Sequence, residues 1–281
     1  MPPRVTVNYL SHYGHYANAA YHRFDNWTTC EPCQTHDDIS AFNLTFSWST
    51  TALPKASFSR GYMGVHMQRQ EIVIVYRGTT HLLDVLGDSQ VIQTQWPEHV
   101  GESRVHSGFV AAYLASREHM RNALKVLLEM HPTFDVYFVG HSLGGAQATL
   151  AFTEFMEEEN RGAVRLVTFG APRVGNGAFA KYVNSQLLQR SNDCSALRVT
   201  NERDLVPHLP APLVPGHYVH GDQEFWVHED ELVECRIHSD GDPGEDPECA
   251  AGTFPLFRNM HDHMHYPGLT LTIPEVHVKQ T

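Results

Sequence analysis

The chain has 281 residues, of which 42% are hydrophobic and 19% charged, a composition typical of one large globular domain or at most two small ones. Its formal charge of −12 at pH 7 makes nucleic acids and anionic bilayers poor partners, because both repel an acidic surface. No apolar run approaches the roughly 18 residues needed to cross a bilayer. We therefore expect no transmembrane segment.

Short β-branched or aromatic runs alternate with amphipathic helical patterns along the chain. Strands are predicted at 71–76, 134–139, 163–169 and 196–200. Helices are predicted at 108–130, 143–158 and 176–189. The first helix is expected to bury one face, made by Val110, Tyr113, Leu114, Leu124, Leu127 and Leu128.

Each predicted helix links two strands, and parallel strands need such crossovers. The fold class is therefore α/β, with a mostly parallel central sheet, flanking helices and antiparallel additions from 216–228. No repeat and no Gly/Ser-rich or Pro-rich linker divides the chain. A single domain over residues 1–281 is the simpler interpretation.

The strongest motif is Gly140-His141-Ser142-Leu143-Gly144, which has the G-x-S-x-G spacing and stands between a predicted strand and a predicted helix. A serine at the tip of such a turn has strained backbone geometry, and the two glycines keep the turn free of side-chain collisions. The first N–H groups of the helix then stabilise an oxyanion. Ser142 is therefore the predicted nucleophile.

A serine hydroxyl needs a histidine to take its proton and a carboxylate to orient that histidine. In α/β folds with this turn the chain order is serine, acid, histidine. Asp204 follows the strand predicted at 196–200, at an edge where the sites of α/β sheets gather. Glu202 and Asp193 are the rival acids. Spacing alone does not choose among the candidate bases His261, His263 and His265.

Seven blocks of sequence, in order, resemble the class 3 lipases, the filamentous-fungal triacylglycerol lipase family that also contains feruloyl esterases. The blocks are 9–21, 72–80, 105–109, 138–145, 168–176, 201–210 and 263–266. The resemblance implies an α/β-hydrolase-like fold and a triad of Ser142, Asp204 and His263. His263 is chosen because the family's His-x-x-Tyr matches His263 and Tyr266, with His261 and His265 as alternatives.

The same resemblance implies an oxyanion hole made by the backbone N–H groups of Thr79 and Leu143. It also implies that His141, Tyr21 and Val206 line the substrate cleft, although each of these residues is equally explicable as core.

A short helical lid is implied at 81–88. Its apolar side chains would cover the site in water and dock onto oil; they are Leu82, Leu83, Val85 and Leu86. We expect Leu82, Leu83 and Leu86 to contact substrate. Feruloyl esterases of this scaffold tend to carry a more polar lid, so the lid composition favours a lipase.

These features predict a serine carboxylic ester hydrolase, in the first place a triacylglycerol lipase acting at a lipid–water interface through an acyl-enzyme. A feruloyl esterase and a non-catalytic lipid-binding homologue are the alternatives. Serine chemistry requires no cofactor and none is predicted. A metal held by His261, His263 and His265 along an extended strand is the weaker hypothesis.

Cysteines and glycosylation sequons favour secretion, with a leader absent from this chain. The sequons are Asn26-Trp27-Thr28 and Asn43-Leu44-Thr45. Cys235 and Cys249 bound an acidic loop and are the pair most expected to form a disulfide. A second bridge between Cys30 and Cys33 would leave Cys194 free.

Overall fold

The computed structural model describes residues 4–22, 30, 33, 37–52, 57–79, 92–158, 163–190, 194–211, 217–236 and 244–271. Its main sheet has eight strands in the order β1-β2-β3-β6-β7-β9-β11-β12. Their bounds are β1 (Phe42–Ala52), β2 (Ser57–His66), β3 (Glu71–Tyr76), β6 (Asp135–His141), β7 (Val164–Phe169), β9 (Cys194–Asn201), β11 (Gln223–His228) and β12 (Glu231–Glu234). The strands from β3 to β11 run parallel, whereas β1, β2 and β12 are antiparallel to their neighbours.

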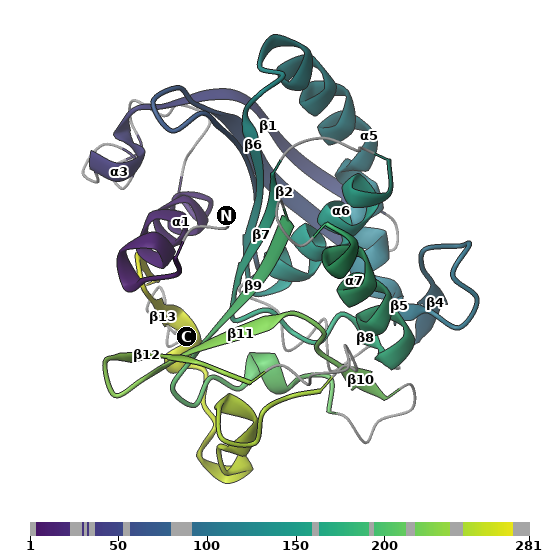
Figure 1. The fold of residues 1–281 in the computed structure, drawn as a ribbon, viewed down its shortest axis with the longest axis vertical. Coiled ribbons are helices and arrows are strands. Elements are labelled where there is room, and N and C mark those ends of the chain that lie inside the picture. The colour runs from purple at the N-terminus through teal and green to yellow at the C-terminus, as the bar shows by residue number, and fades with distance from the viewer. Residues whose placement is uncertain are drawn as a thin grey trace, which may run out of the picture.

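Helices cover both faces of this sheet (Figure 1). One face carries α5 (Ser107–Met130), α6 (Leu143–Glu158) and α7 (Gly177–Gln189), and the other carries α1 (Val7–Ala19) and the short α3 (Asp37–Ser40). Among the helices that the structure describes, none is both long and apolar enough to cross a bilayer.

Two smaller sheets and several single turns complete the fold. The four-stranded sheet contains β10 (Tyr218–Val219), β8 (Gly175–Asn176), β5 (Arg104–His106) and β4 (Gln93–Gln95), and the two-stranded sheet contains β13 (His265–Tyr266) and β14 (Leu269–Thr270). The 3₁₀ turns are η2 (Val206–His208), η3 (Ala250–Gly252), η4 (Pro255–Phe257) and η5 (Asp262–Met264).

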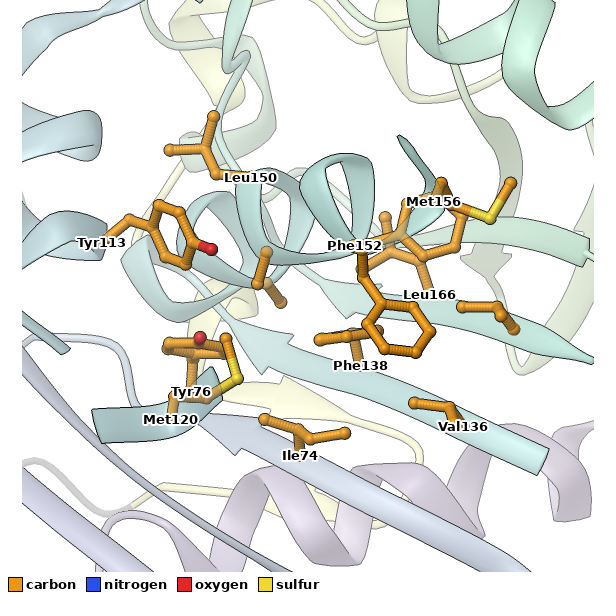
Figure 2. Close-up of a cluster of buried hydrophobic side chains, with 14 of the residues drawn as sticks. Ile74, Tyr76, Tyr113, Met120, Val136, Phe138, Leu150, Phe152, Met156 and Leu166 are labelled. Atoms are coloured by element: carbon orange, nitrogen blue, oxygen red, sulfur yellow. The ribbon is translucent and has the colours of Figure 1, made fainter. Parts of the chain in front are cut away.

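Strand side chains alternate between two cores, one on each face of the sheet. In β3, Ile72 and Ile74 belong to the core beneath α5 and α6, whereas Val73 and Val75 belong to the core beneath α1. Figure 2 shows the first core, where Phe152 of α6 lies over the sheet. Because both faces are covered, the parallel strands are continuous apolar runs, which is why the sequence reveals them.

The predicted α/β class with a mostly parallel sheet is confirmed. Strand β3 and helix α6 have the predicted bounds, and the other predicted strands and helices differ by only a few residues. Two disulfides join Cys30 to Cys33 and Cys235 to Cys249, and Cys194 stands outside both bridges, as expected; its side chain is buried.

Two details of the prediction are wrong. Leu114 is 46% exposed, because it lies one helical position away from the buried Tyr113. Within 216–228, β10 is antiparallel as predicted, but it pairs with β8 in the smaller sheet, whereas β11 continues the main sheet in parallel with β9. The long connection after β9 returns the chain to the same edge of the sheet, so the antiparallel addition is β12 instead.

Candidate active site

Ser142 stands on the turn between β6 and α6. Its φ of +60° is in the left-handed region, which costs an L-residue roughly 1–2 kcal/mol. A Cβ on Gly140 would lie 2.3 Å from the Gly144 carbonyl oxygen. A Cβ on Gly144 would lie 2.2 Å from the Tyr76 carbonyl oxygen. The Ser142 N–H donates to the Phe169 carbonyl at 2.9 Å. Neighbouring strands therefore hold the strained turn in place.

The predicted acid and base meet in the interior. His263 Nδ1 lies 2.8 Å from Asp204 Oδ2, and the two residues are 3% and 2% exposed. Because a carboxylate only accepts, Nδ1 carries the proton and Nε2 is the basic nitrogen. The Val206 N–H donates to Asp204 Oδ1 at 2.8 Å, and the Tyr266 hydroxyl donates to Oδ2 at 2.5 Å. Burial, and then Asp204 itself, raise the pKa of Tyr266, which keeps its hydroxyl protonated.

A second hydrogen-bonded chain supports His263 from the side of the nucleophile. His141 Nε2 lies 2.9 Å from the His263 carbonyl oxygen, and the Tyr21 hydroxyl lies 2.6 Å from His141 Nδ1. Since a carbonyl only accepts, Nε2 donates and Nδ1 accepts from Tyr21, which fixes one neutral tautomer. Burial and the adjacent His263 lower the pKa of His141 well below its usual range.

Two glycines let these groups approach one another. A Cβ on Gly170, whose φ is +56°, would lie 2.8 Å from Asp204 Oδ2 and 2.9 Å from His263 Nδ1. A Cβ on Gly78, just after β3, would lie 2.9 Å from Ser142 Cβ. Ser142 Oγ is buried and makes no hydrogen bond to any residue that the structure describes. The hydrogen bond between Ser142 Oγ and His263 Nε2 therefore stays a prediction.

The predicted oxyanion donors each stand next in the chain to a residue of the site, Leu143 after Ser142 and Thr79 after Gly78. Leu143 is the first residue of α6, and Thr79 follows Gly78 at the end of β3. Of the predicted cleft residues, Tyr21 reaches the site through His141, whereas the Val206 side chain packs in the core. The lid residues Leu82, Leu83, Val85 and Leu86 lie outside the described residues.

The rival residues make other contacts. Glu202 binds His228 Nδ1 at 3.0 Å, and the rings of His261 and His265 stack 4.4 Å apart. Asp193 lies outside the described residues. The extended strand assumed for a metal site is wrong, since 262–264 forms η5.

One further cluster in the described part of the chain has metal-ligand types and spacing: Glu224, Cys235 and Cys249. Its two sulfurs are joined in a disulfide, so this cluster does not offer the thiolates that a metal requires.

Asp262 and Asn259 form a clasp that sequence reasoning missed. Asp262 Oδ2 accepts from the Arg203 N–H at 3.1 Å and from Asn259 Nδ2 at 2.8 Å. The Asn259 backbone N–H donates to the Arg203 carbonyl at 2.9 Å, and its carbonyl accepts from the Leu205 N–H at 3.0 Å. The clasp therefore grips the chain on both sides of Asp204. The one available signal is an acid directly before a candidate histidine.

The parallel sheet, the serine turn after β6 and the buried histidine–aspartate pair beyond β9 define the α/β-hydrolase fold class. The family model for lipase (class 3) matches residues 73–214, just over half of the chain. The chain belongs to the class 3 lipase family.

Individual proteins are similar over most of this chain. A lipase of Rhizomucor miehei is 29% identical over 244 residues, which cover 85% of this chain and 62% of that protein. The secreted mono- and diacylglycerol lipase A of Penicillium camembertii is 29% identical over 210 residues, which cover 73% of this chain and 65% of that protein. The matched part is thus less than two thirds of each relative's length.

The fold is also similar to that of a solved triacylglycerol lipase whose catalytic centre is a serine protease triad. That structure has a TM-score of 0.77 and 28% identity, and the match covers 93% of this chain and 94% of that one.

Proposed function

We propose that this protein is a secreted carboxylic ester hydrolase that acts on acylglycerols at a lipid–water interface. Among the acylglycerols, triacylglycerol is the proposed main substrate. The observation that carries the proposal is the buried His263–Asp204 pair, 2.8 Å between Nδ1 and Oδ2, beside the strained turn of Ser142. Membership of the class 3 lipase family supports it. The two disulfides and the similarity to a secreted lipase support secretion.

In the proposed mechanism His263 Nε2 takes the proton of Ser142 Oγ while Oγ attacks the ester carbonyl carbon. The resulting oxyanion accepts hydrogen bonds from the N–H groups of Thr79 and Leu143. Asp204 stabilises the imidazolium, which then protonates the departing glycerol oxygen and leaves an acyl-serine. Water deprotonated by His263 attacks that acyl carbon and releases the fatty acid and free Ser142.

The test compares the parent with Ser142→Ala on a soluble short-chain nitrophenyl ester. We expect kcat to fall by about 10⁴-fold or more, because the residual rate comes from oxyanion donors and binding alone. Circular dichroism of both proteins checks that the substitution keeps the fold. Equal rates in the two proteins would contradict the proposal and favour a non-catalytic lipid-binding homologue.

Substrate class is decided by offering emulsified triacylglycerol, emulsified diacylglycerol and methyl ferulate to the parent. We expect hydrolysis of the emulsions and little of the ferulate. Cleavage of diacylglycerol alone would correct the substrate to partial glycerides. Cleavage of the ferulate with both emulsions ignored would show a feruloyl esterase.

A further inference from the structure

An exposed apolar turn stands beside the candidate active site. In η4 and the residue before it, Phe254, Leu256 and Phe257 are 58%, 84% and 61% exposed. The two phenylalanine rings lie 5.6 Å apart, and the more exposed Leu256 stands between them in the sequence. These three exposed side chains are here called the η4 patch. Among the other exposed large apolar residues in the described ranges, only Val126 and Met130 are close in sequence, one turn apart on α5, and neither is aromatic.

The η4 patch is held in a defined shape. The Phe257 N–H donates to the Phe254 carbonyl at 3.0 Å, which closes the turn. The Arg258 guanidinium donates to the carbonyl oxygens of Ala251 and Thr253 at 3.2 and 2.9 Å, which braces the turn against η3. The patch is therefore presented to solvent by a built scaffold.

That scaffold is continuous with the candidate site. Two residues after η4, Asn259 forms backbone hydrogen bonds with Arg203 and Leu205, the neighbours of Asp204. Figure 1 shows part of the yellow-green chain before β13 extending beyond the end of the sheet. A surface that receives the patch would therefore lie against the part of the molecule that holds Asp204 and His263.

The size of the patch decides between a protein partner and a lipid one. Two phenylalanines and one leucine expose on the order of 400 Å², about half of what each partner contributes to a stable protein interface. A lipid surface, in contrast, accepts single side chains into its acyl layer without a complementary partner. The area therefore favours lipid.

The charges near the patch and on the whole chain indicate which lipid headgroup the patch would contact. The Arg203 guanidinium carbon lies 5.6 Å from the centre of the Phe257 ring, so a cation stands directly at the edge of the patch. In an amphipathic surface contact such a cation reaches lipid phosphates while the ring enters the apolar layer. The chain as a whole carries −12, which opposes a strongly anionic surface. Zwitterionic phospholipid fits both facts.

We infer that the η4 patch is a lipid-docking surface that inserts Phe254, Leu256 and Phe257 into a zwitterionic phospholipid-coated interface beside the active site. The choice of lipid as partner rests on the proposed function. Phe254, Leu256, Phe257 and the contacts given for them all lie in the part of the chain that the structure describes.

Flotation with phosphatidylcholine vesicles tests the inference, using the Ser142→Ala chain so that no lipid is consumed. Phe254→Ser with Leu256→Ser should weaken vesicle partitioning by at least about tenfold, equivalent to about 1.4 kcal/mol. The matched control is Met130→Ser with Leu188→Ser, whose side chains are 65% and 67% exposed on other helices. The control should float like its parent.

A direct probe places the turn at the lipid. Leu256→Trp should show a blue-shifted emission with vesicles and quenching by brominated phosphatidylcholine. Unchanged partitioning of the double-serine variant, or a Leu256→Trp emission that ignores the vesicles, would overturn the inference. Self-association of the parent that the serine variant abolishes, without vesicle binding, would assign the patch to a protein partner instead.

The test separates this inference from the proposed function. With Ser142 restored, the double-serine variant should hydrolyse a soluble short-chain ester at the parent's rate and lose activity only on an emulsion. A parent that binds vesicles through the patch but hydrolyses no ester would defeat the proposed function and leave the docking surface intact. A parent that hydrolyses esters, but whose vesicle binding is unchanged when the patch is altered, would defeat the docking surface and leave the proposed function intact.

Discussion

Gly170 has no side chain, and this leaves room for Asp204 and His263 to come together. Its φ of +56° is costly for any other residue, and a Cβ would lie within 2.9 Å of Asp204 Oδ2, His263 Nδ1 and the Tyr266 hydroxyl. We predict that Gly170→Ala lowers kcat/KM by at least about 100-fold, equivalent to about 3 kcal/mol, because the pair must separate. Steady-state kinetics on a soluble ester measures this.

Gly101→Ala is the matched control, since a Cβ there meets nothing within 4 Å. It should leave activity and stability unchanged. If Gly170→Ala keeps the parent's kcat/KM, the contact of Gly170 with the Asp204–His263 pair is irrelevant to catalysis.

At the residue scale, the sequence predicts what local pattern encodes. Ser142 is marked by its two glycines, and Asp204 by its place after a buried strand. Asp204 and His263, far apart in the chain, do lie together. Gly170 and Tyr266 appear in blocks that resemble the family, but their contacts with Asp204 depend on how β7 and β13 pack, which no spacing reveals. The catalytic roles stay predictions.

The Asp262–Asn259 clasp joins the loop after β9, which carries Asp204, to the segment that carries His263. Burial raises the pKa of Asp262, but hydrogen bonds from Asn259 and the Arg203 N–H outweigh it, so the pKa is lowered and the ionised acceptor is favoured. Asp262→Ala leaves these donors without their acceptor. We predict about a tenfold lower kcat with little change in KM, and stability reduced by about 1–3 kcal/mol.

The conservative variant Asp262→Asn keeps one acceptor and should recover part of the lost kcat. Glu248→Ala is the control, because Glu248 pairs with the exposed Arg236 away from the site. A loss of stability with kcat unchanged would show that the clasp is merely structural.

The Cys235–Cys249 disulfide closes a segment of 14 residues between β12 and η3. Chain-entropy arguments assign about 3 kcal/mol to a loop of this length. We predict that Cys235→Ser with Cys249→Ser lowers the free energy of unfolding by about 2–4 kcal/mol in urea titrations. Cys194→Ser, which removes a buried thiol outside both disulfides, controls for cysteine loss. An unchanged urea midpoint in the double variant would contradict this role.

At the element scale, doubly buried elements are the ones that sequence predicts. β3 and α6 have the expected bounds because uninterrupted apolar runs and helical periodicity mark them. β1 is missing from the predicted strands although its apolar residues alternate with Asn, Ser and Thr, which is the pattern of a strand with one buried face. It lies at the edge of the main sheet, where it pairs with β2. The β11 direction depends on a long crossover, and direction has no local signature.

At the scale of the whole molecule, buried ionisable groups link stability to pH. Burial lowers the pKa of His106 to about 4 and that of His208 to about 3. The pKa values of His141 and His220 are also lowered well below normal, first by burial. These side chains are neutral in the folded protein. In the unfolded chain they take up protons below the ordinary histidine pKa of 6.5. Acid therefore favours unfolding.

The carboxylates affect the stability of the fold at lower pH than the histidines do. Burial raises the pKa of Glu245, but hydrogen bonds and ion pairing with Arg173 outweigh burial, so the pKa is lowered. A lowered carboxyl pKa contributes stability above the unfolded value of 4.5 that is lost as pH falls through the folded value. Loss of stability between pH 6.5 and about 4.5 is thus assigned to the histidines.

His106→Asn isolates one of these histidines. His106 caps α5 by accepting from the Gly108 N–H at 3.1 Å, and asparagine is also a favourable cap, so the helix start is kept while the titrating group is removed. Between pH 6.5 and about 4.5 the parent's free energy of unfolding should fall more steeply than the variant's, by about 1.4 kcal/mol per pH unit. Urea titrations across this range measure both slopes. Near pH 8 the two proteins should differ only by a constant offset, because the folded and unfolded chains then bind equally few histidine protons. Parallel slopes throughout would mean that His106 takes up its proton without unfolding.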